Sequence, residues 1–504
     1  MLKNIYPVTL VFFVSWSIAD AQTNTAYKEQ YRPQIHFSPK AHWMNDPNGM
    51  VYFENTYHLF FQYYPDSTVW GPMHWGHAIS TDLVHWKEQP IALYPDKLGY
   101  IFSGSAVADV NNTSGFGKKG KIPLIAIYTN HDAAAEKAGK NNFQNQSIAY
   151  SLDNGKTWMK YSGNPVLKNP GITDFRDPKV NWYAPGKKWI MTLAVKDHIT
   201  FYSSANLKDW TLESEFGKAI GAHGGVWECP DIFTLDYNGS KVWVLIVNIN
   251  PGGTNGGSAT QYFTGSFDGK TFTPDNTSTK WLDYGPDEYA GVTWSNTGNR
   301  KIFFGWMSNW NYANVVPTVQ WRSAMTLPRE LSITKVNDTF YVTSMPVKEL
   351  NKIASPAVTF SNIKVTGNTV PVKTGNLTSP YRLTVKTATT EDFSFIFSNE
   401  AEEKLIVGYD KVSNQYYIDR TNAGRNDFSK SFTGKHTAPR ITNTGQVQLT
   451  MIIDHTSIEL FADNGLTTMT GIFFPKKLMN KIYVQSTGNW MIQKLEVSSM
   501  KNIW

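Results

Sequence analysis

Ser151-Leu152-Asp153, followed by an aromatic residue at Trp158, is a phrase that the sequence repeats in similar form. Three other copies share the serine, the acidic or amide third residue and the later aromatic: Ser80-Thr81-Asp82 before Trp86, Ser204-Ala205-Asn206 before Trp210, and Ser266-Phe267-Asp268 before Phe272. Each copy predicts a strand, a polar turn and an aromatic on the returning strand. Their spacing of about 50 to 70 residues suits four-stranded propeller blades. The repeat therefore predicts a β-propeller, with four unrelated β-hairpins as the alternative.

Outward from these phrases the chain is a series of short aromatic and β-branched runs separated by turn residues, and helical periodicity is nearly absent. Such runs occur at residues 57–63, 124–128, 189–194 and 241–247. After Arg329 the tryptophan density falls, and the later runs at 381–386, 405–409, 446–453 and 481–485 predict a β-sandwich. We therefore expect a propeller over residues 30–343, a linker over 344–355 and a sandwich over 356–504.

The amino terminus has the features of a secretory signal peptide. Lys3 precedes an apolar stretch from residue 5 to 18, and Ala19-Asp20-Ala21 forms an A-x-A cleavage pattern. We expect residues 1–21 to be removed on export, which places the protein outside the cell or in the periplasm. No later run approaches about 18 uninterrupted apolar residues, so we expect no membrane anchor.

Composition narrows the classes of function. The net charge is +6, but the basic residues are scattered along the chain, so we expect no nucleic-acid partner. Aromatic residues reach 14% while charged residues fall to 17%, a balance that suits extensive sheet and sugar-facing surfaces. The single cysteine, Cys229, excludes an intrachain disulfide, so stability must come from a large core.

Three acidic clusters lie beside aromatic or proline residues. They are Trp43-Met44-Asn45-Asp46-Pro47-Asn48-Gly49, Asp174-Phe175-Arg176-Asp177-Pro178 and Trp227-Glu228-Cys229-Pro230-Asp231. Taken singly, each can be a turn or an ordinary structural ion pair. Taken together, they supply what glycoside hydrolysis requires, a protonated and an ionised carboxyl group on either side of the scissile bond.

The clusters and the phrases between them resemble glycoside hydrolase family 32, which contains invertases, inulinases and levanases. The resemblance covers nearly the whole chain after residue 21. Further matching phrases occur in the family's order: Phe61-Gln62-Tyr63, Trp70-Gly71-Pro72-Met73-His74-Trp75-Gly76-His77 and Phe102-Ser103-Gly104-Ser105. The resemblance implies a five-bladed propeller followed by a β-sandwich.

The resemblance also implies a function and the residues that carry it. Asp46 is the expected nucleophile, and Glu228 is the expected general acid/base. Asp177 is expected to bind fructosyl hydroxyls and to stabilise the transition state. The expected substrate-binding residues are Trp43, Asn45, Gln62, Trp70, Phe102, Ser103, Arg176 and Trp310. We expect Arg176 to hold Asp177 ionised and oriented, and Trp43 to help close the pocket behind one fructosyl unit. The implied activity is retaining exo-hydrolysis of terminal β-fructofuranosyl units of sucrose, inulin or levan.

Several alternatives stay open on the sequence. A fructosyltransferase shares the same covalent intermediate, a fructan-binding protein shares the fold without the chemistry, and an arabinanase shares the five-bladed architecture. His36, His42, His74 and His77 lie near the first cluster without a metal-binding spacing. We expect no metal and no other cofactor.

Overall fold

The computed structural model describes residues 27–375 and 377–504, so the signal peptide predicted at residues 1–21 lies outside the described residues. This part of the chain forms seven β-sheets. Its one α-helix is α1 (Ala133–Lys137), and three short 3₁₀ helices are η1 (Ala184–Gly186), η2 (Ala313–Val315) and η3 (Lys348–Lys352). Among these residues, no helix has the length and apolar character needed to cross a membrane. The all-β fold class is confirmed.

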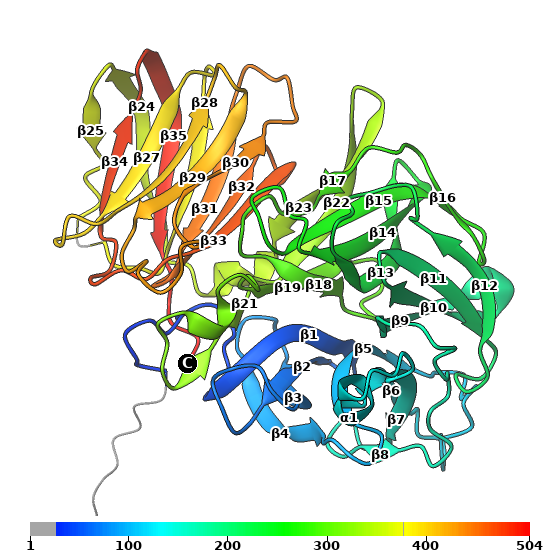
Figure 1. Cartoon of the computed structure of the whole chain (residues 1–504). Coiled ribbons are helices and arrows are strands. Elements are labelled where there is room, and N and C mark those ends of the chain that lie inside the picture. Colours follow the sequence, from blue (N-terminus) through cyan, green and yellow to red (C-terminus); the bar gives the residue numbers. More distant parts are fainter. Residues whose placement is uncertain (1–26, 376) are drawn as a thin grey trace, which may run out of the picture.

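Five sheets surround a common axis and form the blades of the propeller (Figure 1). The first contains β1 (His42–Phe53), β2 (Thr56–Tyr64), β3 (His74–Ser80), β4 (Lys87–Leu93) and β20 (Trp321–Arg322). The second contains β5 (Tyr100–Ala108), β6 (Leu124–His131), β7 (Gln144–Ser151) and β8 (Met159–Lys160). The third contains β9 (Phe175–Tyr183), β10 (Lys188–Val195), β11 (His198–Ser204) and β12 (Thr211–Phe216).

The two remaining blades are less regular. The fourth contains β13 (Val226–Tyr237), β14 (Ser240–Asn250), β15 (Ala259–Phe267), β16 (Phe272–Pro274) and β17 (Lys280–Trp281). The fifth contains β18 (Tyr289–Thr293), β19 (Ile302–Met307), β21 (Ala324–Met325), β22 (Arg329–Val336) and β23 (Thr339–Pro346). Because β20 pairs in parallel with the start of β1, the end of the propeller sequence is tied to its beginning. This pairing closes the ring.

The recurring phrase of the sequence joins the third and fourth strands in four of these blades. Ser80, Ser151 and Ser204 each end a third strand, and each hydroxyl donates to the acidic or amide side chain two residues later, over 2.8 to 3.3 Å. These short bonds stabilise the turn, as Ser and Asp side chains commonly do. The propeller interpretation of the repeat is confirmed.

The second domain is a sandwich of two six-stranded sheets. One sheet contains β24 (Val358–Thr366), β35 (Asn489–Ser499), β26 (Tyr381–Thr387), β31 (Gln448–Ile453), β32 (Ser457–Ala462) and β33 (Thr467–Ile472). The other contains β25 (Thr369–Pro371), β34 (Lys481–Gln485), β27 (Phe393–Ser398), β28 (Lys404–Asp410), β29 (Gln415–Asn422) and β30 (Lys435–Pro439). Alternate residues Phe393, Phe395 and Phe397 of β27 are buried, as the period of two predicts for a strand with one face in a core. The sandwich prediction is confirmed.

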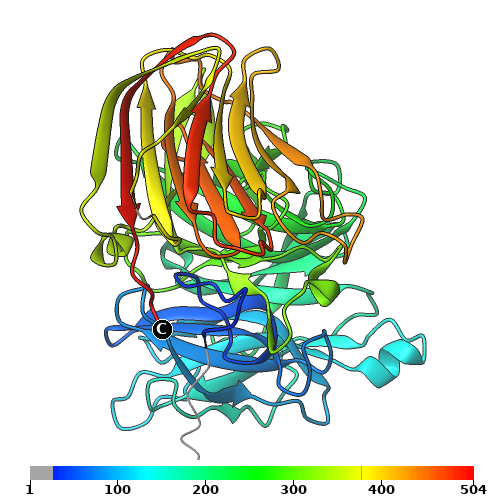
Figure 2. The same ribbon diagram turned by 90° about the vertical axis from the view of Figure 1, so that its left-hand side faces the viewer.

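The sandwich packs against one side of the propeller (Figure 2), and the contact buries charged groups. Arg329 of the propeller donates to Glu459 of the sandwich over 2.9 and 2.5 Å and to Asp283 over 2.8 Å. His36 bridges Asp454 and Glu459 over 2.7 and 2.9 Å. We call these five residues the interface cluster. Strand β23 extends to Pro346, past the propeller boundary proposed at residue 343, and β24 begins at Val358.

Candidate active site

The first strand of every blade lies nearest the propeller axis, and each is interrupted by a β-bulge. The bulged pairs of residues are Asn45–Asp46 in β1, Phe102–Ser103 in β5, Asp177–Pro178 in β9, Cys229–Pro230 in β13 and Ala290–Gly291 in β18. A bulge puts two residues opposite one on the neighbouring strand and so redirects a side chain. Proline lacks the N–H that a ladder needs, which is why Pro47, Pro178 and Pro230 occur at or beside these positions.

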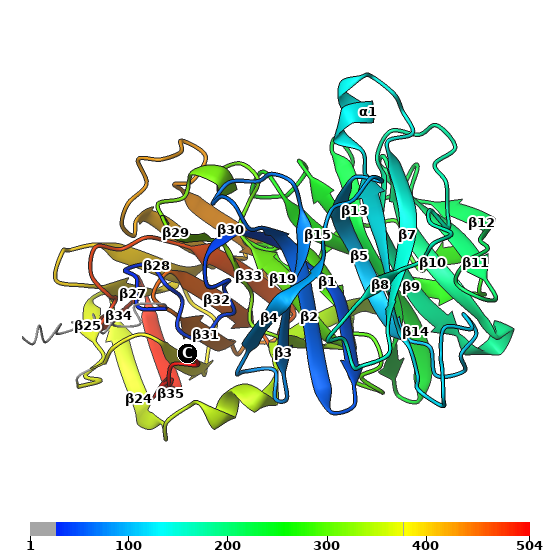
Figure 3. The same ribbon diagram turned by 90° about the horizontal axis from the view of Figure 1, so that it is seen from below.

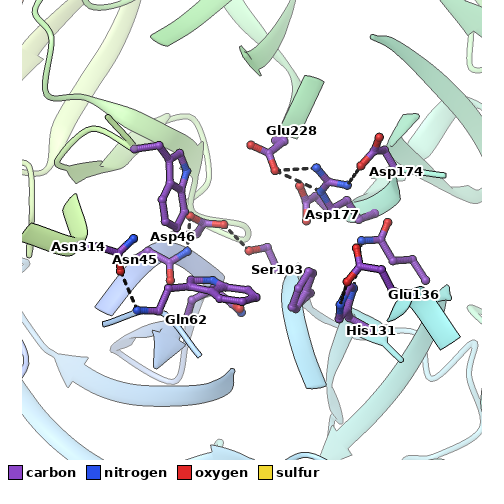
Figure 4. Close-up of a pocket in the computed structure, with 15 residues that line it drawn as sticks. Asn45, Asp46, Gln62, Ser103, His131, Glu136, Asp174, Asp177, Glu228 and Asn314 are labelled. Carbon is purple, nitrogen blue, oxygen red and sulfur yellow. Dashed lines mark hydrogen bonds and ion pairs between the residues drawn. The ribbon is translucent and has the colours of Figure 1, made fainter. Parts of the chain in front are cut away.

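The bulges direct side chains from different blades into one cavity of about 380 Å³ on the axis. Its lining includes Asp46 from the first blade, Ser103 from the second, Asp177 from the third and Glu228 from the fourth (Figure 4). The residues predicted to act together are therefore adjacent, although the chain separates Asp46 from Glu228 by three blades. Among the described residues, no group of three or more His, Cys, Asp or Glu side chains is arranged to hold a metal ion.

Asp46 is held by two hydrogen bonds at the base of the cavity. The Ser103 hydroxyl donates to Oδ2 over 2.5 Å, and the Asn45 amide donates to Oδ1 over 2.8 Å. Burial and the nearby Glu228 raise the pKa of Asp46, while these two donors oppose the rise. The carboxyl group is thus oriented by its neighbours in a site that is electrostatically unfavourable for its charge.

Asp177 lies close to Asp46 and shares a neighbour with it. The Cys229 backbone N–H donates to Asp177 Oδ2 over 3.0 Å, and the Cys229 sulfur lies 3.6 Å from Asp46 and 3.7 Å from Asp177. Burial raises the pKa of Asp177 to about 7; the charge of Arg176 opposes this, and those of Glu228 and Asp46 add to it. Burial and the same carboxylates raise the pKa of the Cys229 thiol, which is therefore a neutral neighbour of both acids.

Both oxygens of Glu228 are engaged. Arg176 donates to Oε1 through Nε over 3.1 Å and through Nη2 over 2.9 Å, while the Tyr289 hydroxyl donates to Oε2. Arg176 also donates to Asp174 over 2.5 Å. The expectation that Arg176 orients Asp177 is therefore corrected, because its hydrogen bonds go to Glu228 and Asp174. The backbone turn at Asp177, with φ of 65°, points that carboxyl group toward the amide of Cys229 instead.

The predicted binding residues fall into two groups. Seven line the cavity, namely Asn45, Gln62, Trp70, Phe102, Ser103, Arg176 and Trp310. Trp43 does not, because its side chain is fully buried and its indole N–H donates to Asn45 over 2.7 Å. Its ring also packs on Trp310 with centroids 5.8 Å apart. The assignment of Trp43 to substrate contact is therefore corrected, since this side chain supports Asn45 and Trp310 from behind.

Sequence reasoning missed several side chains of the site. His131, Glu136, Gln144, Asp174 and Asn314 line the cavity without having been assigned to it. Tyr289 was also missed; it lies on β18, the inner strand of the fifth blade, and none of the four recurring phrases follows that strand. His131 ends β6 and Gln144 begins β7, while Glu136, Asp174 and Asn314 lie on connections between strands, where no repeat marks their positions.

The geometry and the comparisons with known proteins agree on the class. Residues 36–344 match the glycosyl hydrolases family 32 N-terminal domain, and residues 349–500 match the C-terminal domain of that family. The chain is 44% identical over 521 residues to a levanase from Bacillus subtilis, covering 100% of this chain and 76% of that protein. It is 40% identical over 516 residues to an extracellular exo-inulinase from Aspergillus ficuum, covering 95% and 96%.

The fold comparison leads to the same family. The crystal structure of an exo-inulinase from Aspergillus awamori superposes with a TM-score of 0.86 at 38% identity, covering 95% of this chain and 100% of that one. The family match and these relatives define a glycoside hydrolase, with which the carboxyl groups at the propeller axis are consistent. The chain belongs to glycosyl hydrolase family 32.

Proposed function

We propose that this enzyme removes terminal β-D-fructofuranosyl units from inulin, levan or sucrose, with Asp46 as nucleophile and Glu228 as general acid/base. The observation that carries the proposal is the convergence of Asp46, Asp177 and Glu228 from three blades in one axial cavity. The levanase and exo-inulinase relatives support fructans as the substrate class. The inner strands of four blades contribute to the lining of this cavity, and the exo-inulinase relatives support action at the end of a fructan chain.

The proposed reaction is a double displacement. Protonated Glu228 gives its proton to the glycosidic oxygen while the Asp46 carboxylate attacks the anomeric carbon, and the bond to the leaving sugar breaks. The ionised Glu228, held by Arg176 and Tyr289, then takes a proton from water, whose oxygen displaces Asp46. Two inversions return the product to the β configuration.

Asp177 is the proposed stabiliser of the transition state. Positive charge develops on the fructosyl ring as the bond breaks, so an adjacent carboxylate contributes most at that moment. The backbone N–H of Cys229 keeps the Asp177 carboxyl group beside Asp46 and facing the cavity. Asn45, Gln62, Trp70 and Trp310 are the proposed contacts to the fructosyl hydroxyls and ring faces.

We also propose that the enzyme acts after export. The signal-peptide pattern of residues 1–21 supports this, as does the extracellular exo-inulinase among the relatives. The test is expression with the native leader in a secreting host. Finding the protein in the cytosol of that host would contradict the proposal.

The test of the activity is product chromatography over the first few per cent of conversion on sucrose, inulin and levan. We expect free fructose as the main product, with no earlier ladder of oligosaccharides. Growth of longer oligosaccharides at high sucrose would identify a transferase instead. Binding of levan without product would identify a non-catalytic binder.

A further inference from the structure

The connection between β6 and β7 carries the α1 helix, which projects from the propeller (Figure 3), and its Glu136 lines the cavity. Two of the unassigned lining residues belong to it or adjoin it. Glu136 lies on α1 with a side chain that is 53% exposed, and His131 ends β6 with a side chain that is 5% exposed. A half-exposed carboxylate next to a buried imidazole is therefore presented at the wall of the cavity.

The His131 ring is fixed in position by aromatic packing. It stacks on Phe102 with centroids 4.2 Å apart and planes 5° from parallel, and it packs edge to face with Phe143, with centroids 5.4 Å apart. Phe102 belongs to the same bulge as Ser103, which holds Asp46. The imidazole is thus rigidly connected to the part of the site where the proposed nucleophile lies.

A chain of hydrogen bonds determines which nitrogen of His131 carries the proton. The Phe175 backbone N–H donates to Gln144 Oε1 over 2.8 Å, so the amide nitrogen of Gln144 is the end that points to His131 Nδ1 at 3.4 Å. Nδ1 is therefore the acceptor and Nε2 carries the hydrogen, which it donates to Glu136 Oε2 over 3.2 Å. Burial lowers the pKa of His131, although the charge of Glu136 opposes this, and a neutral ring suits the arrangement.

Glu136 and His131 occupy the side of the cavity away from Asn45 and Asp46 (Figure 4). Arg176 connects the two sides, since it donates to Glu228, the proposed acid, and to Asp174. In the proposed reaction the departing oxygen lies near Glu228, and Glu136 lines the same cavity on the side away from Asp46.

The charges of the lining indicate what this side binds. Five carboxyl side chains line the cavity, those of Asp46, Glu136, Asp174, Asp177 and Glu228, against one arginine and no lysine. Such a lining disfavours anions and suits neutral ligands rich in hydroxyl groups. A carboxylate that uses one oxygen to accept from an imidazole retains further lone pairs for hydroxyl donors.

We propose that Glu136, oriented by His131, forms the subsite that accepts hydrogen bonds from hydroxyl groups of the leaving sugar. The proposal rests on the proposed function, because it presupposes that a fructosyl bond is cleaved between Asp46 and Glu228. The proposal gives the α1 connection a role in substrate specificity, because the substrates share the fructosyl unit and differ in the leaving group.

The test compares kcat/KM for sucrose and an inulin-type trisaccharide with kcat/KM for p-nitrophenyl β-D-fructofuranoside, whose leaving group has no sugar hydroxyls. Glu136→Ala and Glu136→Gln should lower the ratio of sugar substrate to aryl substrate by about 10-fold, the usual effect of losing a hydrogen bond to a charged group. The matched control is Lys137→Ala, the next residue of α1, which is exposed and does not line the cavity. It should keep the wild-type ratio.

The outcomes separate the two proposals. A ratio that changes by less than about 3-fold in both Glu136 variants, or that changes equally in the Lys137 control, would overturn the subsite while leaving the fructosidase activity in place. Failure of the wild-type enzyme to release fructose from any of the three compounds would overturn the proposed function itself.

Discussion

Two buried charge clusters in this molecule contain the same kinds of residue in opposite arrangements. In the interface cluster, cations alternate with anions, as Arg329 lies between Asp283 and Glu459. At the propeller axis, Asp46, Asp177 and Glu228 converge, and Arg176 is the cation among them. Both clusters join segments that are distant in sequence. The interface cluster has two cationic side chains for three carboxylates, whereas the axis has one arginine for Asp46, Asp177 and Glu228.

The pKa shifts of the two clusters reflect this difference. At the interface, burial works against ionisation, yet Arg329 and His36 hold the pKa of Glu459 below its usual value. At the axis, burial and neighbouring carboxylates raise the pKa of Asp46 and Asp177. Ion pairs contribute to joining the two domains, whereas the proposed mechanism uses the unpaired carboxyl groups of the axis to stabilise a developing positive charge.

The largest expected effect is on catalysis at the axis. Asp46→Ala and Glu228→Ala should each lower kcat by about 10⁴-fold or more, because each removes one half of a mechanism that acts as a unit. Asp46→Ala should also leave the Tm equal to or above that of the wild type, since it removes an unfavourably buried carboxyl group. Fructose release and calorimetry measure the two quantities. Wild-type turnover in either folded variant would contradict the assignment.

The interface cluster should respond in the opposite way. Arg329→Met leaves Glu459 and Asp283 without their shared partner, so the free energy of unfolding should fall by about 3 to 5 kcal/mol. The folded variant should keep kcat within a few-fold of the wild type, because Arg329 does not line the cavity. Urea titration and initial rates check both parts. A stability loss below about 1 kcal/mol would show that the cluster does not join the domains.

A smaller catalytic effect is expected at Asp177. Asp177→Asn keeps the shape but loses the charge that faces the fructosyl ring, so kcat should fall by about 10² to 10³-fold while KM changes little. Steady-state kinetics on sucrose separates the two constants. A change confined to KM would assign Asp177 to ground-state binding only.

The pH dependence of stability provides a finer comparison. The pKa of Asp177 in the folded protein, about 7, exceeds its ordinary value, so its contribution to stability is fully present below about pH 4 and is lost as the pH rises through 7. Asp177→Asn lacks this dependence. Its stability relative to the wild type should therefore rise between pH 4 and 8, on the order of 2 to 4 kcal/mol. If the difference in unfolding free energy between Asp177→Asn and the wild type stays constant from pH 4 to 8, the raised pKa of Asp177 is contradicted.

Much of the fold could be predicted from local patterns. The serine and aspartate turns repeat because every blade must reverse its chain at the same place, as Ser151 and Asp153 illustrate. The acid–proline pairs at Asp46 and Asp177 mark bulges, because proline interrupts a strand where a side chain is redirected. The ends of strands were harder to predict from the sequence. For example, β23 continues through Ser344 to Pro346 because these residues pair with β22.

The contacts of the site were harder to predict, because they depend on which blades become neighbours. Arg176 precedes Asp177 in sequence, yet the bulge turns the two side chains apart and brings Arg176 to Glu228, 52 residues away. Trp43 adjoins the first motif, yet the same strand geometry buries it behind Asn45. Adjacency in sequence indicated which segments form the site, but it did not indicate the direction in which each side chain points.

The most direct test of the account is to trap the covalent intermediate. Glu228→Gln, incubated with β-fructosyl fluoride and rapidly quenched, should carry one fructosyl residue, because the activated donor needs no acid for bond cleavage while the second step lacks its base. Peptide mass spectrometry should locate the added mass on Asp46, and Asp46→Ala in the same background should carry none. Labelling of a different carboxyl group, or no labelling while the fluoride is still consumed, would contradict the central claim that Asp46 is the nucleophile.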